Sequence, residues 1–368
     1  MNSEKDFIFD NPINSVENGI FQWSSPSNIA LVKYWGKKEN QIPANPSISF
    51  TLNNCKTITK LSFDKKDIST ALNVTNSNFS FDLLFEGKPK EDFKPKIQKF
   101  FERIAVYCPY LEDYHFIIDT QNTFPHSSGI ASSASGMAAL AMNIMSLEKE
   151  LNPAISESHF YQKASFLARL GSGSACRSIR GSIVVWGKND SFAESSDLFG
   201  VALSSKVHEN FKNYQDTILL VDKGEKQVSS TVGHDLMHHH PYAETRFLQA
   251  HNNLSKIKTV LETGNLEHFI KIVESEALTL HSMMMTSLPY FILMKPNTLA
   301  IINKIWKFRS DTQIPVCFTL DAGANVHVLY PEIVAEKVLQ FIKNELVGYC
   351  QNGQYICDEI GFGSQLIM

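Results

Sequence analysis

The chain has 368 residues, of which 43% are hydrophobic and 20% are charged, and its formal net charge at neutral pH is −4. This length allows two domains, or one large domain with a well-buried core. The slightly acidic balance argues against a general nucleic-acid binder, because such proteins usually carry a basic face, and no apolar run reaches the roughly 18 residues that a membrane span needs.

The six cysteines are scattered along the chain and contain no C-x-x-C pair. This pattern is typical of free thiols rather than of a disulfide framework or a zinc site. Residues 1–6 show no basic region followed by an apolar one, so no secretory signal is expected. We therefore expect a cytoplasmic protein whose partners are neither nucleic acids nor membranes.

Residues 1–20 are polar with little periodicity, and we expect a loose arm there. An apolar strand over residues 29–34 follows, and it contains Lys33. A lysine in an apolar strand must be exposed on one face or must have an anionic partner. Two interpretations stay open: a strand with one solvated edge, or Lys33 and Lys37 converging on a polyanion.

Alternating apolar residues predict further strands in the first half, in an antiparallel, hairpin-rich sheet. An amphipathic pattern over residues 94–107 predicts a helix. The predicted strands span residues 43–52 after an initial turn, 57–63, 79–85 and 115–119.

Residues 125–136, P-H-S-S-G-I-A-S-S-A-S-G, combine five serines with two glycines. An apolar, helix-forming run begins directly after them at Met137. Such a loop lets the backbone approach a ligand closely, and the N–H groups of the following helix favour a phosphate. No lysine follows the second glycine, so this is not the Walker-type phosphate loop. The alternative is a helix start that merely packs tightly.

A second small-residue loop, G-S-G-S-A-C-R, covers residues 171–177 between a predicted helix at 157–170 and a predicted strand at 182–186. It ends in Arg177, whose guanidinium can bind phosphate or carboxylate through two parallel hydrogen bonds. Two such loops in one chain favour a role in binding anions.

The second half reads as α+β after a polar stretch at residues 188–211, which we expect to be a linker or a surface insertion. A loop around Ser230 follows the first strand of this half, and the sequence D-A-G-A-N begins at Asp321, after another strand. The predicted strands span residues 216–221, 314–320 and 326–330, and the predicted helices span 235–262, 265–283, 296–309 and 332–343.

Four stretches resemble the GHMP superfamily of small-molecule kinases, and more closely its diphosphomevalonate decarboxylase branch. They are residues 28–37 (N-I-A-L-V-K-Y-W-G-K), 125–136, 171–178 (G-S-G-S-A-C-R-S) and 321–325. The resemblance implies a two-domain α+β fold of the GHMP kinase type, with mixed or antiparallel sheets flanked by helices. It also implies domains over residues 1–190 and 191–368, and a homodimer.

The reaction implied by the resemblance is the ATP-dependent decarboxylation of mevalonate 5-diphosphate to isopentenyl diphosphate in the mevalonate pathway of isoprenoid biosynthesis. The 3-hydroxyl is phosphorylated, and phosphate and CO2 then leave. Asp321 would serve the hydroxyl and then the positive carbon, Lys33 would pair with Asp321 or the transferring phosphate, and Arg177 would orient the substrate carboxylate. Without the other motifs, Asp321 would read as a turn or capping aspartate.

The resemblance also implies two sets of binding residues. The substrate is expected to contact Asn28, Tyr34, Lys37, Ser172, Gly173, Ser174 and Arg177. The ATP phosphates are expected to contact Ser128, Gly129, Ala131, Ser132, Ser133 and Ser230. Magnesium is expected to be held through the ATP phosphates, and Ser133 is the one side chain that could reach it.

The chain departs from the family pattern at His126-Ser127-Ser128, where Thr-Ala-Ala is usual, at Ala324, which replaces a proline, and at Thr286, where many relatives have aspartate. The changes at His126-Ser127-Ser128 and at Thr286 leave room for a decarboxylase of mevalonate 5-phosphate or for a mevalonate 3-kinase. A non-catalytic metabolite-binding scaffold should have lost a charged catalytic residue, and none has been lost here.

Overall fold

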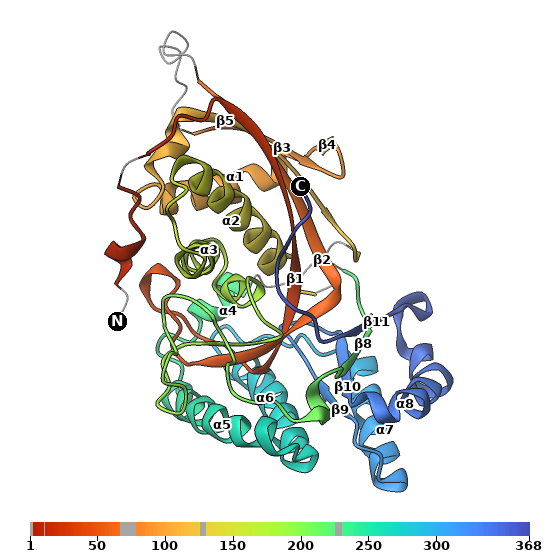
Figure 1. The fold of residues 1–368 in the computed structure, drawn as a ribbon. Helices are drawn as coiled ribbons and strands as arrows, with labels where there is room; N and C mark the ends of the chain where they lie inside the picture. The colour runs from red at the N-terminus through yellow and green to blue at the C-terminus, as the bar shows by residue number, and fades with distance from the viewer. Residues whose placement is uncertain (1–2, 11, 67–78, 126–129, 225–229) are drawn as a thin grey trace.

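The computed structural model describes residues 3–10, 12–66, 79–125, 130–224 and 230–368 (Figure 1). Two β-sheets organise this part of the chain, and helices pack against both. The predicted α+β fold with mixed and antiparallel sheets is confirmed.

The first sheet has the strand order β12-β1-β2-β5-β3-β4, and β6 joins it at β2 and carries β7 at its outer edge. Neighbouring strands run antiparallel except β3 and β5, which are parallel, so the antiparallel sheet expected in the first half is a mixed one. The strands are β1 (Asn18–Val32), β2 (Ser47–Lys65), β3 (Ser80–Phe85), β4 (Lys88–Pro89), β5 (Tyr114–Asn122), β6 (Ile183–Trp186), β7 (Val201–Ala202) and β12 (Gln365–Leu366).

Three helices cover one face of this sheet, as Figure 1 shows: α1 (Lys94–Ile104), α2 (Ser132–Leu151) and α3 (Glu157–Gly171). α2 lies in the middle and is buried along most of its length. It is rich in alanine and methionine all round, as a helix surrounded by protein must be. Its first turn therefore has a fixed place beside the sheet.

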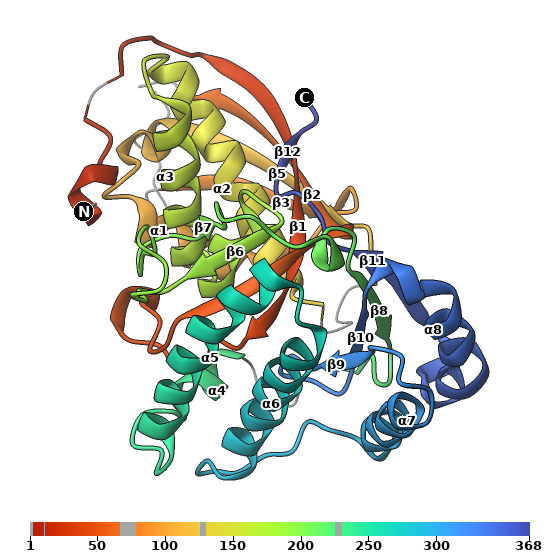
Figure 2. The ribbon, with the colours of Figure 1, turned by 60° about the horizontal axis from the view of Figure 1, so that its bottom comes forward.

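The second sheet is antiparallel, with the order β11-β8-β10-β9. In Figure 2, α5 and α6 lie side by side below the end of β1. The strands are β8 (Gln215–Leu219), β9 (Cys317–Thr319), β10 (Val326–Tyr330) and β11 (Tyr355–Glu359), and the helices are α4 (Ser230–Asp235), α5 (Ala243–Thr263), α6 (Leu266–Met285), α7 (Pro296–Thr312) and α8 (Ala335–Phe341).

Short helical turns complete the description. They are η1 (Glu4–Phe7), η2 (Glu39–Gln41), η3 (Glu91–Phe93), η4 (Pro109–Asp113), η5 (Gly173–Ser178), η6 (Glu209–Phe211), η7 (Glu332–Val334), η9 (Val347–Tyr349) and η10 (Gln351–Gly353), all of the 3-10 type, and the π-helical turn η8 (Ile342–Leu346).

One hydrophobic cluster crosses from the first half of the chain to the second. It joins Ile29 and Leu31 of β1 to Ile218 of β8, Leu254 of α5 and Phe269 of α6. The end of β1 is therefore packed against the helices of the second half, and this is where Lys33 follows the strand.

Two polar segments contribute side chains to the hydrophobic core, so the expectation of a loose arm over residues 1–20 is wrong, and the stretch at 188–211, expected to be a linker or a surface insertion, is anchored to the first sheet. In the N-terminal arm Phe7 and Phe9 are buried in the first core. In residues 188–211 Phe192, Phe199 and Phe211 are buried, and β7 pairs with β6. Isolated aromatic residues leave no periodic signal, but each removes a large apolar area from water.

Two element boundaries differ from the prediction, and two strands were not predicted. α2 begins at Ser132, five residues before the expected start, so Gly136 lies inside the helix. The helix expected at 235–262 begins only at Ala243 as α5, and a separate short helix, α4, ends at Asp235. β11 and β12 were not predicted, and β12 returns the end of the chain to the first sheet beside β1.

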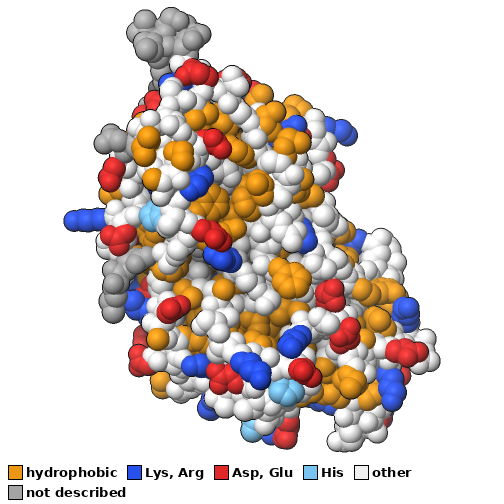
Figure 3. All heavy atoms as spheres, in the orientation of Figure 1, with side chains coloured by type: hydrophobic (Ala, Val, Ile, Leu, Met, Phe, Trp, Pro, Cys, Tyr) orange, Lys and Arg blue, Asp and Glu red, His pale blue; other side chains and the backbone are white. Residues whose placement is uncertain are grey.

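On the face drawn in Figure 3, acidic and basic side chains are interspersed, and the described residues there form no extended region of one sign. Over the described ranges, no helix combines the length and the apolar character that crossing a membrane requires. The same ranges contain no group of three or more His, Cys, Asp or Glu side chains suited to holding a metal ion. All six cysteines are free thiols.

Candidate active site

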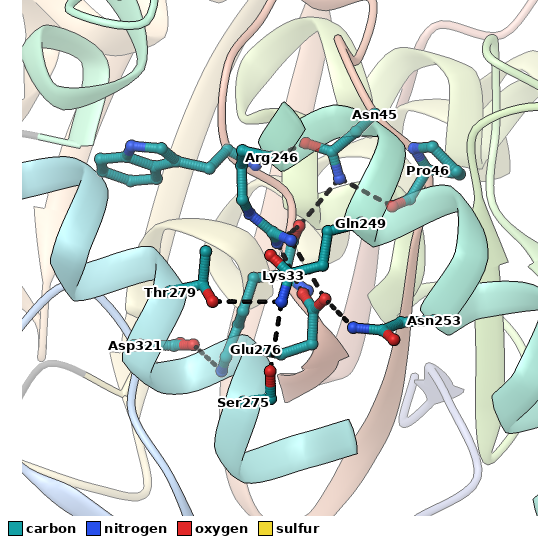
Figure 4. A network of polar contacts seen from close by, with 11 residues as sticks. Lys33, Asn45, Pro46, Arg246, Gln249, Asn253, Ser275, Glu276, Thr279 and Asp321 are labelled. Carbon is teal, nitrogen blue, oxygen red and sulfur yellow. Dashed lines mark hydrogen bonds and ion pairs between the residues drawn. The ribbon is translucent and has the colours of Figure 1, made fainter. Parts of the chain in front are cut away.

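Lys33 and Asp321 meet where the two halves of the chain join. Lys33 directly follows β1, and Asp321 follows β9 by two residues. The Lys33 Nζ lies 3.0 Å from the Asp321 Oδ1 (Figure 4). The Lys33 side chain is only 2% exposed, so the interpretation with a solvated edge is wrong. The Asp321 side chain is 28% exposed, so one partner of the pair faces solvent.

Burial dominates the electrostatics of this pair. Removing the Lys33 amine from water lowers its pKa, and the charge of Asp321 and the hydrogen bond to it oppose that shift. The net direction is downward from the ordinary lysine value. The ammonium form of Lys33 is therefore a stronger acid than that of a surface lysine, and the charge of Asp321 and the hydrogen bond to it favour its protonation.

Arg177 is fixed by side chains of the first half. Its Nε donates to the Asn28 Oδ1 at 3.3 Å, its Nη1 donates to the Ser47 Oγ at 2.6 Å, and the guanidinium lies over the Trp186 ring. Burial lowers the pKa of Arg177, and the negative charge of Asp321 works against this. The guanidinium is therefore a fixed cation in a water-poor site, with its orientation set by neutral partners.

The close approach of the second small-residue loop to Tyr34 requires a glycine. A Cβ atom at Gly173 would lie 2.9 Å from the Trp186 ring and 3.0 Å from the Tyr34 Oη. The Tyr34 ring in turn lies against His234 of α4, with centroids 4.2 Å apart. Burial raises the pKa of Tyr34, so its hydroxyl stays protonated and can donate a hydrogen bond.

Lys37 lies at the open side of this cluster. Its Nζ is 3.3 Å from the Asp235 Oδ1 of α4. The neighbouring His234 accepts a hydrogen bond from the Gly36 N–H through its Nδ1 at 3.0 Å. Burial, followed by the nearby charges of Lys37 and Arg177, lowers the pKa of His234 to about 3, so the ring is neutral at physiological pH. α4 thus holds the backbone beside Lys37.

The predicted phosphate-binding residues lie at the start of α2. Ala131, in the left-handed backbone region with φ 42°, precedes Ser132 and Ser133 in the first helical turn. The Ser133 Oγ lies 3.5 Å from the Ser172 Oγ, and Lys96 of α1 donates a hydrogen bond to Ser133. The two small-residue loops, far apart in the sequence, are therefore neighbours.

Three predicted contacts with ATP have no described side chain. Ser128 and Gly129 lie outside the described residues, as do His126 and Ser127. Ser230 is the first residue of α4, and its side chain also lies outside the description.

A cavity of about 170 Å³ opens beside the start of α2. Its wall is mostly apolar and includes hydroxyl and amide groups. The residues that define it best are Thr57, Leu83, Phe85, Phe93, Lys96, Asn122, Ser132, Ser133 and Met137. A flat, largely apolar group with a few polar edges fits such a lining.

The sequence did not single out several residues that hold this site together. Ser47 fixes Arg177, His234 fixes the backbone at Gly36, and Glu276 and His281 of α6 contact the backbones of Lys33 and Asp321. Each belongs to an ordinary strand or helix pattern. The one usable signal was a charged or polar residue at a helix position that should face the core.

Comparisons with known proteins agree over most of the chain. Residues 25–197 match the family model of the diphosphomevalonate decarboxylase-like N-terminal domain, and residues 217–360 match that of the mevalonate 5-diphosphate decarboxylase C-terminal domain. The diphosphomevalonate decarboxylase of Ganoderma lucidum is 27% identical over 346 residues, which cover 87% of this chain and 80% of that relative.

Two solved structures illustrate the similarity in fold. MDDEF in complex with MVAPP, AMPPCP and magnesium is 27% identical with a TM-score of 0.79, and the match covers 95% of this chain and 99% of that one. The mevalonate diphosphate decarboxylase of Staphylococcus aureus is 26% identical with a TM-score of 0.79, and the match covers 95% and 98%. With two family models in succession and neighbours along nearly its full length, the chain belongs to the diphosphomevalonate decarboxylase family of enzymes.

Proposed function

We propose that this chain converts mevalonate 5-diphosphate and ATP to isopentenyl diphosphate, CO2, ADP and phosphate. The observation that carries the proposal is the contact between Lys33 and Asp321, which joins the two halves of the chain and leaves the carboxylate partly open. Arg177 is a buried cation, and the negative charge of the same aspartate favours its protonated form by raising its pKa. The reaction needs a carboxylate, a cation beside it and a second, fixed cation for the substrate carboxylate. Asp321, Lys33 and Arg177 provide these three groups in one place.

ATP fits the start of α2 and the cavity beside it. The amide groups of a helix start and the serine hydroxyls at Ser132 and Ser133 suit phosphate oxygens. The apolar walls formed by Phe85 and Phe93 suit a base. MDDEF was solved with AMPPCP and magnesium, which supports use of Mg²⁺ and ATP here. When bound, ATP would supply the γ-phosphoryl group, and Mg²⁺ would neutralise part of the charge on its phosphates.

Asp321 acts on the 3-hydroxyl in the first half of the reaction. Its open carboxylate accepts the hydroxyl proton as the hydroxyl oxygen bonds to the γ-phosphorus and the bond to ADP breaks. Lys33, 3.0 Å away, holds the carboxylate in place before the transfer and stabilises the negative oxygens during it.

Arg177 acts on the carboxylate of the substrate in the second half. The bond between C3 and the phosphorylated oxygen breaks, phosphate leaves, and positive charge develops at C3. The carbon–carbon bond to the carboxylate then supplies the electrons of the new double bond, and CO2 leaves. Arg177 holds that carboxylate in line through a guanidinium that Asn28 and Ser47 keep fixed.

The diphosphate tail is assigned to the open side of the site. Tyr34 and Lys37 come from the segment after β1, and Ser172, Gly173 and Ser174 come from the second loop. Lys37 pairs with Asp235 across 3.3 Å, so a bound diphosphate competes with that carboxylate for the ammonium group. Asn28, which also contacts the Ser174 carbonyl, would fix the loop.

Three coarser features complete the proposal. The free thiols support a cytoplasmic protein. The family suggests a homodimer, which light scattering on the purified protein would test. The proposed domains cover residues 1–190 and 191–368, and for comparison one family model ends at residue 197 and the other begins at 217.

A single assay tests the proposed reaction. The protein is incubated with Mg-ATP and mevalonate, its 5-phosphate or its 5-diphosphate, while ADP and CO2 are both measured. We expect equal amounts of ADP and CO2, and the fastest turnover with the 5-diphosphate. ADP without CO2 would indicate a 3-kinase, preference for the 5-phosphate would indicate the sister decarboxylase, and neither product would indicate a binding protein.

A further inference from the structure

One helix of the second half contacts both members of the Lys33–Asp321 pair. α6 carries Glu276 and His281, five residues apart on the helix. Glu276 contacts the backbone of Lys33, and His281 contacts the backbone of Asp321. Figure 4 shows Glu276 next to the Lys33 backbone while the Lys33 side chain extends to Asp321. A single helix, α6, therefore contacts the backbones of both Lys33 and Asp321.

Glu276 holds Lys33 as half of a buried ion pair with Arg246 of α5. Its Oε2 accepts hydrogen bonds from the Lys33 N–H at 2.9 Å and from the Arg246 Nη2 at 2.5 Å. The same Nη2 donates to the Lys33 carbonyl at 3.1 Å. Both charged side chains are fully buried. The N–H and the carbonyl of Lys33 are thus both bonded to one ion pair, which leaves its backbone little freedom.

Two amides complete this contact. Asn253 of α5 donates to the Glu276 Oε1 at 2.6 Å, and Asn45 donates to the Lys33 carbonyl at 2.9 Å. Buried ion pairs of this kind add little net stability, because both charges lose their hydration. The hydrogen bonds from Glu276 and Arg246 to the Lys33 backbone indicate that this ion pair fixes the backbone geometry at Lys33.

His281 holds the other member. Its Nε2 lies 3.1 Å from the Asp321 carbonyl oxygen, and since a carbonyl can only accept, this nitrogen carries the proton. The ring is almost completely buried, and burial lowers its pKa to about 4. A neutral imidazole therefore donates to the Asp321 backbone, and the carboxylate is left for other partners.

We propose that α6 sets the distance between Lys33 and Asp321, and that Glu276 and His281 are positioning residues for the reaction. Neither residue touches the reacting atoms. A displacement of about 1 Å in a reacting group can lower the rate about 10²-fold, so fixing both backbones matters more to turnover than to substrate binding. This inference rests on the proposed function, since it assigns the pair a part in that reaction.

The test uses two substitutions at the same position. His281→Gln keeps an N–H donor at the place of Nε2, whereas His281→Leu removes it. We expect His281→Leu to lower kcat about 10- to 100-fold with Michaelis constants changed less than about threefold. His281→Gln should recover kcat to within about threefold of the unaltered protein. Glu276→Gln, where it folds, should resemble His281→Leu.

The matched control is Glu274→Gln on the same helix. Glu274 pairs with Arg309 of α7 at 2.6 Å and accepts from the Trp306 Nε1 at 2.9 Å, away from Lys33. We expect this change to lower the melting temperature and to leave kcat per folded molecule unchanged. An equal loss of kcat in Glu274→Gln would overturn the proposal, because it would mean that any weakening of α6 has the same effect.

Two further outcomes would overturn it: an unchanged kcat in His281→Leu, or equal losses in His281→Leu and His281→Gln. Hydrogen exchange of the segment around Asp321 provides a readout without turnover, and it should be faster in His281→Leu only. If the unaltered protein does not turn over mevalonate 5-diphosphate, the proposed reaction fails, and the exchange data alone then decide whether His281 anchors this segment.

Discussion

Two lysines are buried beside a carboxylate in the part of the chain that the structure describes, and the two pairs differ in what surrounds them. Lys163 of α3 and Glu148 of α2 lie 2.6 Å apart, and both side chains are 1% exposed. Lys33 and Asp321 lie 3.0 Å apart, but the aspartate is 28% exposed. We call Lys163–Glu148 the closed pair, because both side chains are buried, and Lys33–Asp321 the open pair, because the aspartate is accessible to solvent.

The partners of the closed pair explain its role. Glu148 also accepts a hydrogen bond from the Tyr110 hydroxyl at 3.0 Å, and Lys163 also donates to the Tyr107 carbonyl at 2.9 Å. Burial raises the pKa of Glu148, and Lys163 opposes the shift. A substrate cannot reach this carboxylate, so the pair can only stabilise the packing of α2 on α3. Asp321 of the open pair can take part in a reaction because a substrate can reach its carboxylate.

The largest expected effect follows from neutralising the open carboxylate. Asp321→Asn keeps the shape of the side chain and removes its charge, so we expect turnover to fall on the order of 10³-fold. Lys33 loses its counter-charge, so the melting temperature should also fall, whereas the binding of ATP should remain close to that of the unaltered protein. A well-folded variant with more than about a tenth of normal turnover would show that the open pair is structural too.

The matching change in the closed pair should affect stability instead. Glu148→Gln leaves Lys163 buried without its counter-charge, so we expect a loss of about 3 kcal/mol in the free energy of unfolding. Turnover per folded molecule should stay within about twofold, because α2 keeps its backbone. Thermal denaturation and active-site titration together measure both quantities. A large loss of turnover with normal stability would contradict the distinction between the pairs.

A third lysine pair, Lys37 with Asp235, lies nearer the surface, with side chains 15% and 54% exposed. Lys37→Ala removes one charge-assisted contact of about 1.5 kcal/mol, so the Michaelis constant for the substrate should rise about tenfold. Turnover should fall less than about threefold. The control is mevalonate 5-phosphate, and equal activity on both substrates in the unaltered protein would refute the assignment of Lys37 to the diphosphate.

The smallest effect is the pH dependence of stability that His281 contributes. Its pKa is about 4 in the folded chain and 6.5 when unfolded, so the unfolded state binds more protons between these values. Its contribution is complete above pH 6.5 and is lost as the pH falls toward 4. His281→Gln should reduce the slope of unfolding free energy against pH by at most about 1.4 kcal/mol per unit in this window. An unchanged slope would show that the ring is protonated when folded.

The four motifs and the fold class could be predicted from the sequence because each has a local signature. Lys33 in an apolar strand demanded either solvent or an anion, and serine and glycine before an apolar run indicated a helix start. The position of that start was missed by five residues, because Ser132 to Gly136 are small enough to read as loop or helix.

The residues that set the site's geometry could not be predicted in this way. Glu276, Arg246 and His281 lie on amphipathic helices, where a single polar residue facing inward is a local signal that does not reveal its partner. Their partners are far away along the chain and depend on how α5 and α6 pack against the end of β1. Buried aromatic residues such as Phe7 and Phe192 were missed for the same reason.

A double-substitution cycle on the single-turnover rate tests most directly whether Lys33 and Asp321 act as one unit. Lys33→Met and Asp321→Asn should each lower the rate on the order of 10³-fold, and the combined variant should be little slower than the slower single one. The same cycle on Lys163→Met and Glu148→Gln should leave the rate per folded molecule nearly unchanged. If the losses at Lys33 and Asp321 multiply instead, the two residues act independently, and the open pair is not the reacting unit.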